Sequence, residues 1–195
     1  MCDIYKSVNV ALGANLESVF GVPFDTVSAA MRLLEADGFS VAARSRIFRT
    51  PCFPAGAGPD YANACVMLNI PDGATPHDVL DHLHKIEAAC GRQRKDRWGA
   101  RTADLDLLTF GQTVLPDLGR FAQWRDLPAP EQLRQTPDQL IVPHPRLQDR
   151  AFVLVPLNDI APDWQHPVSG KTVAQMYADL PQELLEEITP IDGSD

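Results

Sequence analysis

The order of short strand-like and helix-like segments constrains this fold more than any other feature of the sequence. Residues 8–12 form an apolar run that ends at Gly13, which predicts a short buried strand. Apolar residues then recur at helical spacing over residues 27–34, and Gly38 is a natural end for that helix. Residues 39–48 alternate enough to predict a second strand. The first part of the chain therefore predicts strand, helix and strand.

The next part of the chain continues this alternation. Residues 61–70 predict a strand, which a stretch dense in Pro and Gly separates from the strand before it. Thr75 and Pro76 suit the start of a helix, and Gly91 closes the apolar stripe that follows them. Residues 105–110 predict a last strand. The complete order is typical of an α+β ferredoxin-like sandwich, in which helices pack on a mainly antiparallel sheet.

Length and pattern favour a single domain. The chain has 195 residues, 45% of them hydrophobic, which suits one domain over residues 1–195. Residues 114–137 hold several prolines and no sustained period, so we expect an inserted surface loop there. The tail after Lys171 predicts a short amphipathic helix and a frayed end after about residue 187.

Charge and cysteine usage exclude several classes of protein. The formal net charge of −9 argues against broad nucleic-acid binding, which needs a basic surface. No apolar run approaches the roughly 18 residues of a membrane span, and the first residues lack the layout of a secretory signal. No Cys-x-x-Cys pair occurs, which favours reduced thiols in the cytoplasm for Cys2, Cys52, Cys65 and Cys90. We therefore expect a cytoplasmic protein without a nucleic-acid or membrane partner.

An acidic pair follows a basic segment directly. Five of the 17 basic residues fall within residues 92–101, between the second helix and the last strand. Asp104 and Asp106 are two apart on that strand, so both carboxylates project from one face while Leu105 and Leu107 point to the other. Magnesium favours a few carboxylates and keeps its other positions for water and phosphate oxygens. The pair and the basic segment together indicate phosphoryl transfer with bound metal.

Simpler interpretations of these residues remain open. An Asp-x-Asp on a strand is often a solvated face, and a basic run is usually a solvated loop. Because the acidic pair and the basic run are adjacent in an acidic chain, binding of metal and phosphate is supported about as well as a solvated strand face and a solvated loop. The sequence holds no Gly-x-x-x-x-Gly-Lys-Ser/Thr motif, so ATP would bind without a P-loop. Gly13-Ala14-Asn15 is either a phosphate nest or only a turn.

Aromatic and histidine residues give weaker signals. Tyr61 and Asn63 share a strand face, which suits stacking on a flat heterocycle and reading its polar edge, although a half-buried tyrosine and a strand-edge asparagine are the simpler interpretation. His144 lies between two prolines, on a stiff loop where a surface or hydrogen-bonding role is more usual. Arg150 and Phe152 place a cation and an aromatic ring on one face of an expected extended segment.

These pieces occur together, and in order, in one enzyme family. The most specific block is Arg97-Trp98-Gly99-x-Arg101-Thr102-x-Asp104-Leu105-Asp106. Supporting blocks span most of the chain apart from residues 114–137 and the tail: Ala11-Leu12-Gly13-Ala14-Asn15-Leu16, Thr50-Pro51, Pro59-Asp60-Tyr61-Ala62-Asn63-Ala64, Ile86-Glu87, Gly91-Arg92-Gln93-Arg94, Val142-Pro143-His144-Pro145, Arg150-x-Phe152-Val153-Leu154-x-Pro156-Leu157 and Ile160-Ala161-Pro162. On these blocks the chain resembles 6-hydroxymethyl-7,8-dihydropterin pyrophosphokinase.

The resemblance implies a fold, a reaction and a role for each matching residue. The expected reaction transfers pyrophosphate from ATP to the hydroxymethyl group of the reduced pterin and releases AMP, a step of folate synthesis. Two magnesium ions, ATP and the pterin would be the partners, and we favour a monomer. The implied roles are as follows: Asp104 and Asp106 hold the metals; Arg92 and Arg101 meet the phosphates; Tyr61 and Phe152 sandwich the pterin, with Asn63 and the backbone near Thr50 and Phe53 on its polar edge; Arg94 and Trp98 close a mobile loop over ATP; and Glu87, His144 and Arg150 lie at the nucleotide or the transferred group.

The chain departs from the family pattern at a few positions. Ala14 replaces a usual serine, and Cys52 stands where a second proline is common. Residues 139–141 lack an arginine that often contacts ATP in the family, and Arg134 is one candidate substitute. Two other functions are also considered: an inactive nucleotide-binding module with the same fold, and a magnesium-dependent nuclease, which the overall acidity disfavours.

Overall fold

The structure contains a mainly antiparallel sheet, as the sequence predicts. The computed structural model describes residues 7–52, 56, 58–91, 102–128, 131 and 134–191. Its six-stranded sheet follows the order β5-β1-β4-β3-β6, with β2 also paired to β4, and every pairing is antiparallel. The strands are β1 (Ser7–Ala14), β2 (Ser40–Arg44), β3 (Phe48–Thr50), β4 (Tyr61–Asn69), β5 (Asp104–Phe110) and β6 (Thr189–Pro190). β1 and β4 are therefore central, which is the ferredoxin-like arrangement expected from the sequence.

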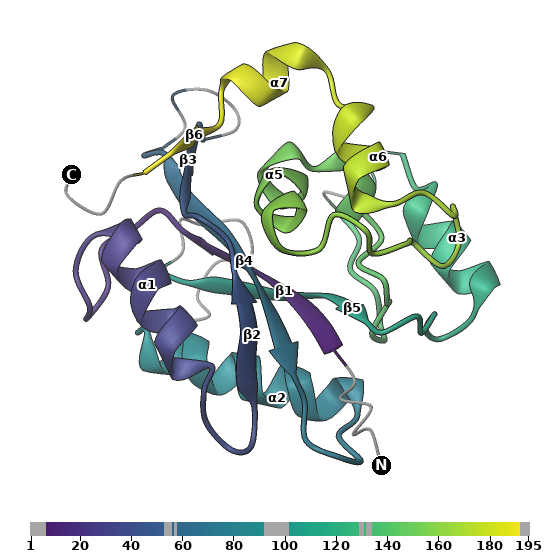
Figure 1. Ribbon diagram of the computed structural model, residues 1–195, viewed down its shortest axis with the longest axis horizontal. Coiled ribbons are helices and arrows are strands. Elements are labelled where there is room, and N and C mark those ends of the chain that lie inside the picture. The colour runs from purple at the N-terminus through teal and green to yellow at the C-terminus, as the bar shows by residue number, and fades with distance from the viewer. Residues whose placement is uncertain are drawn as a thin grey trace.

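Helices cover both faces of the sheet (Figure 1). Helices α1 (Pro23–Leu33) and α2 (Pro76–Ala89) cover one face, over a core that includes Leu12, Leu83 and Leu105. The predicted start of α2 is confirmed, because Thr75 and Asp78 form a reciprocal capping box. Helices α5 (Ala151–Ile160) and α6 (Val173–Ala178) cover the other face, over a second core. Within the described ranges, the structure also has α3 (Leu118–Arg125), the 3₁₀ turn η1 (Leu147–Asp149) and α7 (Gln182–Glu186).

The single strand expected over residues 39–48 is wrong. The structure has two strands there, β2 and β3, which pair with different parts of β4. Ser45 explains the break, because its Oγ accepts the N–H of Cys65 at 2.9 Å and donates to the carbonyl of Arg46 at 2.6 Å. A side chain thus replaces one step of the backbone ladder.

Two segments differ in local structure from what the sequence predicts. Residues 114–137 include α3, which Asp117 caps by accepting the N–H of Arg120 at 2.9 Å. Phe121 anchors this helix: it is fully buried, with its ring 5.6 Å from that of His166. The extended segment expected at Arg150–Phe152 is also wrong beyond Arg150, since α5 begins at Ala151.

The tail is more ordered than a frayed end from residue 187 implies. The short helix expected after Lys171 is present as α6. β6 then pairs with β3, and the N–H of Ile191 donates to the carbonyl of Ile47 at 2.8 Å. The structure therefore corrects this expectation for residues 189–191.

Candidate functional site

Gly13 lies where the strands bring the predicted site residues together. It pairs with Asp104 on one side and with Asn63 on the other. Directly opposed residues of antiparallel strands project to the same face, so Asp104 and Asn63 flank a residue that has no side chain. Tyr61 and Asp106 lie two residues along their strands and share this face. Since neighbouring strands are about 4.8 Å apart, Asp104 and Asn63 are separated by roughly 10 Å.

The site faces α5 rather than α1 and α2. Cys65 lies two residues beyond Asn63 on the same face, and its Sγ is 3.7 Å from the carbonyl oxygen of Val153 in α5. Leu105 and Leu107 project to the opposite face and belong to the core under α1 and α2, as predicted. The alternation of β5 thus separates a packed face from the face that carries Asp104 and Asp106.

The amide of Asn63 is held in a fixed orientation. Its Nδ2 donates to Oγ1 of Thr50 at 2.6 Å, and both side chains are buried. Its Oδ1 lies over Gly13, where an added Cβ would come within 2.8 Å of that oxygen. Glycine at position 13 therefore makes the space that this amide occupies. The predicted pairing of Thr50 with Asn63 in one site is consistent with this contact.

Arg150 and Phe152 lie beside each other at the start of α5. The guanidinium carbon of Arg150 is 5.6 Å from the centroid of the Phe152 ring, a cation–π distance. Burial lowers the pKa of Arg150, whereas Asp106 and Asp104 raise it. The electrostatic effect of these two carboxylates indicates that the charge of Arg150 lies near the acidic pair. Phe152 is 41% exposed, which leaves much of its side chain free to contact a ligand.

His144 is neutral and held by backbone groups. Its own N–H donates to the carbonyl of Leu108 at 2.8 Å, and its Nδ1 accepts the N–H of Arg146 at 3.1 Å. This bond assigns the ring proton to Nε2. Burial of the ring, followed by repulsion from Arg150 and Arg146, lowers the pKa of His144 to about 3, although Asp104 opposes the shift. At neutral pH the ring is therefore an uncharged hydrogen-bonding group.

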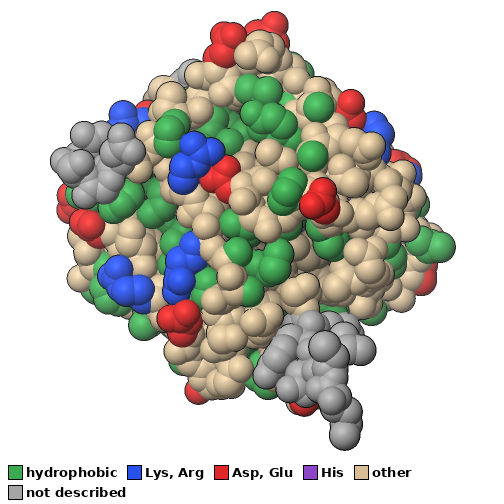
Figure 2. Space-filling view, viewed as in Figure 1, with side chains coloured by type: hydrophobic (Ala, Val, Ile, Leu, Met, Phe, Trp, Pro, Cys, Tyr) green, Lys and Arg blue, Asp and Glu red, His purple; other side chains and the backbone are tan. Residues whose placement is uncertain are grey.

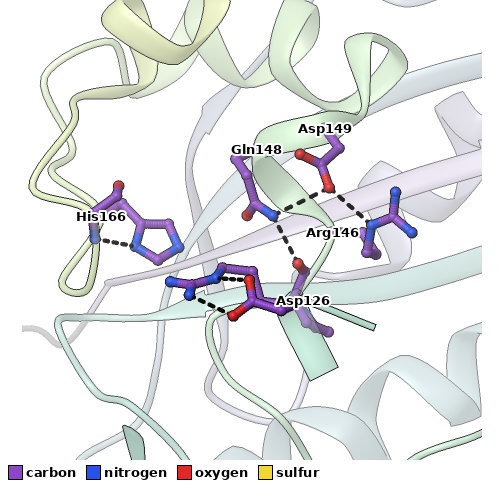
Figure 3. A network of polar contacts seen from close by, with 8 residues as sticks. Asp126, Arg146, Gln148, Asp149 and His166 are labelled. Atoms are coloured by element: carbon purple, nitrogen blue, oxygen red, sulfur yellow. Dashed lines mark hydrogen bonds and ion pairs between the residues drawn. The ribbon is translucent and has the colours of Figure 1, made fainter. Parts of the chain in front are cut away.

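Arg146 is a cation near this site that sequence reasoning missed. It repels both His144 and Arg150, which places its charge near theirs. Its Nε donates to Oδ2 of Asp149 at 3.0 Å, and Gln148 Nε2 donates to the same oxygen at 3.3 Å (Figure 3). The turn η1 creates this arrangement. The only sequence signal was a basic residue just after Val142-Pro143-His144-Pro145.

Glu87 lies on the α2 side of the sheet. Its side chain is 3% exposed, and its Oε1 accepts the N–H of Leu105 at 2.9 Å. The Glu87 carboxylate thus reaches the peptide group between Asp104 and Asp106 from the α2 side of the sheet, whereas the two aspartate side chains project to the other side. An ATP contact by Glu87 stays a prediction.

Several predicted residues lie outside the described part of the chain. They are Phe53, Arg92, Arg94, Trp98 and Arg101. Among the residues that are described, no group of three or more His, Cys, Asp or Glu side chains is arranged to hold a metal ion. A donor set of Asp104 and Asp106 alone still fits magnesium, which takes one or two carboxylates and completes its shell with water and substrate phosphate oxygens.

A hollow of about 280 Å³ lies elsewhere, between the end of α3, η1 and α6. Figure 3 shows part of its lining around Gln148, Asp149 and His166. None of the predicted site residues lines it, and two of its cations already form ion pairs, Arg125 with Asp126 and Lys171 with Asp179, both at 2.8 Å. We therefore assign the candidate site to the α5 face of the sheet.

The face shown in Figure 2 gives no support to the nuclease alternative. On the face shown in Figure 2, the basic side chains that the structure describes are scattered singly, most of them near acidic ones. A broad basic patch is the usual footprint of nucleic-acid binding. Within the described ranges, no helix has both the length and the apolar character to cross a membrane.

Comparison with known proteins identifies the family. The model of the 7,8-dihydro-6-hydroxymethylpterin-pyrophosphokinase (HPPK) family matches residues 9–162. A 2-amino-4-hydroxy-6-hydroxymethyldihydropteridine pyrophosphokinase of Synechocystis is 38% identical over 173 residues, which cover 86% of this chain and 72% of that protein. A protein of the same name from Pseudomonas aeruginosa is 36% identical over 185 residues, covering 94% of this chain and 97% of that one.

Solved structures agree with the fold. An HPPK-DHPS variant of Plasmodium falciparum, crystallised with pterin and p-hydroxybenzoate, aligns with a TM-score of 0.65 at 14% identity and covers 95% of this chain. The present chain spans about half of that protein, 47% of its length. At this identity the likeness concerns the fold alone. The family match over most of the chain and the two close relatives show that this chain belongs to the 7,8-dihydro-6-hydroxymethylpterin-pyrophosphokinase family.

Proposed function

We propose that this protein transfers pyrophosphate from ATP to 6-hydroxymethyl-7,8-dihydropterin in folate synthesis. The hydroxymethyl oxygen forms a bond to the β-phosphorus of ATP, and the bond from that phosphorus to the α–β bridging oxygen breaks. AMP leaves with the bridging oxygen, and the hydroxyl proton is released. The family membership and the names of the relatives support this reaction.

One geometric observation carries the proposal: the acidic pair and the amide of Asn63 share a sheet face, with Gly13 between them. A separation of roughly 10 Å between Asp104 and Asn63 suits a flat bicyclic substrate whose reactive arm reaches toward a polyphosphate. Asn63 and Thr50 would bind the polar edge of the pterin, together with backbone near Phe53. Tyr61 and Phe152 would stack on its ring.

The cations of the site would bind and orient the polyphosphate. Asp104 and Asp106 would hold two magnesium ions, whose charge, when bound, neutralises the phosphate oxygens. Arg150 and His144 would contact the nucleotide or the transferred group, His144 as an uncharged Nε2–H donor. We add Arg146 to this group because its charge lies near both. Arg92, Arg94, Trp98 and Arg101 keep the roles that the resemblance implies, and Arg146 is an alternative to Arg134 for the missing ATP-contacting arginine.

We further propose a cytoplasmic monomer in which residues 114–137 are an insertion. The described site residues come from one sheet and from the segments beside it within a single chain, which supports a monomer. Cys52, Cys65 and Cys90 are free thiols, which suits a reducing compartment. Light scattering after size-exclusion chromatography measures the oligomeric state.

The reaction products test the proposed function. The protein is incubated with ATP, magnesium and 6-hydroxymethyl-7,8-dihydropterin, and nucleotides are separated by ion-exchange chromatography. We expect AMP in equal amount to the pterin pyrophosphate, and none when the pterin is omitted. Stoichiometric ADP without AMP would overturn the assignment, and absence of both products would favour an inactive nucleotide-binding module.

A further inference from the structure

The buried carboxylate of Glu87 meets a backbone group that the sheet leaves unpaired. β5 is at one end of the strand order, so only β1 pairs with it among the described strands. In an antiparallel ladder, the N–H groups of an edge strand point alternately toward and away from the neighbour. The N–H of Leu105 donates to Oε1 of Glu87 at 2.9 Å, so it points away from β1.

The neighbouring residues are anchored from the other side. Because the directions alternate, Asp104 and Asp106 turn their own backbone groups toward their β1 partners, Gly13 and Ala11. The backbone of the acidic pair is thus fixed by β1 on one side and by α2, through Glu87, on the other. A buried N–H without a partner is costly, so loss of this acceptor would weaken the anchoring of the strand on the α2 side.

We propose that Glu87 is a positioning residue for the metal-binding pair. It fixes the Leu105 peptide and thereby the spacing and direction of the Asp104 and Asp106 carboxylates. This inference rests on the proposed function, since it takes those carboxylates as magnesium ligands. It goes beyond the family-derived expectation for Glu87, because it assigns this 3% exposed side chain a role through its bond to Leu105.

Two substitutions separate positioning from direct contact. Glu87→Gln keeps an oxygen acceptor for the Leu105 N–H but removes the charge. Glu87→Met keeps the approximate size and the helix propensity but removes the acceptor. Loss of a group that orients metal ligands typically costs 10–100-fold in metal affinity. We expect Glu87→Met to weaken Mn²⁺ binding about tenfold, measured by electron paramagnetic resonance with a non-hydrolysable ATP analogue, and Glu87→Gln to stay within about twofold of wild type.

The exchange rate of the Leu105 amide proton, measured by NMR without metal, gives a second readout that does not depend on turnover. We expect Glu87→Met to lose protection at Leu105 and Glu87→Gln to retain it.

Thr109→Val is the matched control on the same strand. Thr109 is fully buried, and its Oγ1 accepts the N–H of Asn9 at 3.1 Å at the far end of β5. This variant should lower the melting temperature as Glu87→Met does, yet leave Mn²⁺ affinity unchanged. Equal loss of metal affinity in Thr109→Val would mean that general destabilisation explains the effect.

The outcomes separate this inference from the proposed function. Wild-type Mn²⁺ affinity in Glu87→Met would overturn the positioning role, and so would a tenfold loss in Glu87→Gln, which would show that the charge itself is needed. A wild-type protein that binds no Mn²⁺ with the ATP analogue and forms no AMP would instead refute the proposed function.

Discussion

Gly13→Ala tests the part of the site that the structure defines most sharply. The new Cβ would lie 2.8 Å from Oδ1 of Asn63, well inside van der Waals contact. The amide cannot simply rotate away, because its Nδ2 is bonded to Thr50 at 2.6 Å. The substitution therefore either strains β1 or breaks the bond between Asn63 and Thr50.

The expected size of the effect follows from opposing contributions. Overpacking a buried site costs about 1–3 kcal/mol, whereas replacing glycine with alanine stabilises by about 0.4–1 kcal/mol through the unfolded chain. The free energy of unfolding should therefore fall by roughly 1–2 kcal/mol. If the amide moves and one hydrogen bond to the pterin is lost, about 1.4 kcal/mol of binding energy goes with it, a tenfold rise in Kd.

Urea unfolding and fluorescence titration with the pterin, in the presence of magnesium and an ATP analogue, measure both quantities. Thr50→Val completes a double-mutant cycle with Gly13→Ala, because it removes the hydroxyl that holds the Asn63 amide. In that background Gly13→Ala should cost less, with a coupling energy of at least about 0.5 kcal/mol. Unchanged stability and unchanged pterin affinity in Gly13→Ala would refute this account of the site, and strictly additive effects would refute the route through Asn63.

Three further predictions concern the charged groups. In Asp106→Asn, metal-free stability should change little, because relief of repulsion from Asp104 offsets lost attraction to Arg150. The rise in melting temperature that magnesium and an ATP analogue cause in wild type should disappear. AMP formation should fall at least about 10²-fold. Arg92→Ala and Arg101→Ala should each lower kcat by about 10²-fold or more with smaller effects on pterin affinity in steady-state assays, and a rise in KM alone would contradict a transition-state role. His144 has a pKa of about 3 when folded and roughly 6.5 when unfolded, so its contribution to stability is complete above about pH 6.5 and is lost as pH falls toward 3, by up to about 1.4 kcal/mol per pH unit. His144→Gln should therefore flatten the fall in unfolding free energy between roughly pH 6.5 and 4. An equally steep fall in both proteins would contradict a neutral ring at His144.

The sequence predicted the features that depend on local period. The two-residue period of β5 put Asp104 and Asp106 on one face and Leu105 in the core, as observed. The same period put Tyr61 and Asn63 on one face of β4. The cap at Thr75 correctly marked the start of α2. Each of these depends on a few adjacent residues, which is why sequence reasoning reached them.

Features that depend on distant partners were missed. The break between β2 and β3 depends on Ser45 meeting the N–H of Cys65, a contact that only the folded sheet creates. Helix α3 has eight residues, which are too few for a clear helical period. Phe121 anchors the helix through its contact with His166, which is distant in the sequence and therefore could not be predicted from it. The charge of Arg146 acts on His144 and Arg150, a relation that the position of Arg146 just before η1 did not indicate. These are consequences of tertiary packing.

The short strand β6 has a practical consequence for modified versions of the protein. It covers the outer edge of β3, the strand whose last residue, Thr50, holds the amide of Asn63. A version of the chain shortened to end before Thr189 would leave that edge open to pairing with other molecules, a known route to aggregation. It would also loosen the support behind Thr50. An affinity tag attached after β6 should therefore reduce pterin binding more than a tag inserted in a loop such as the turn at Gly73.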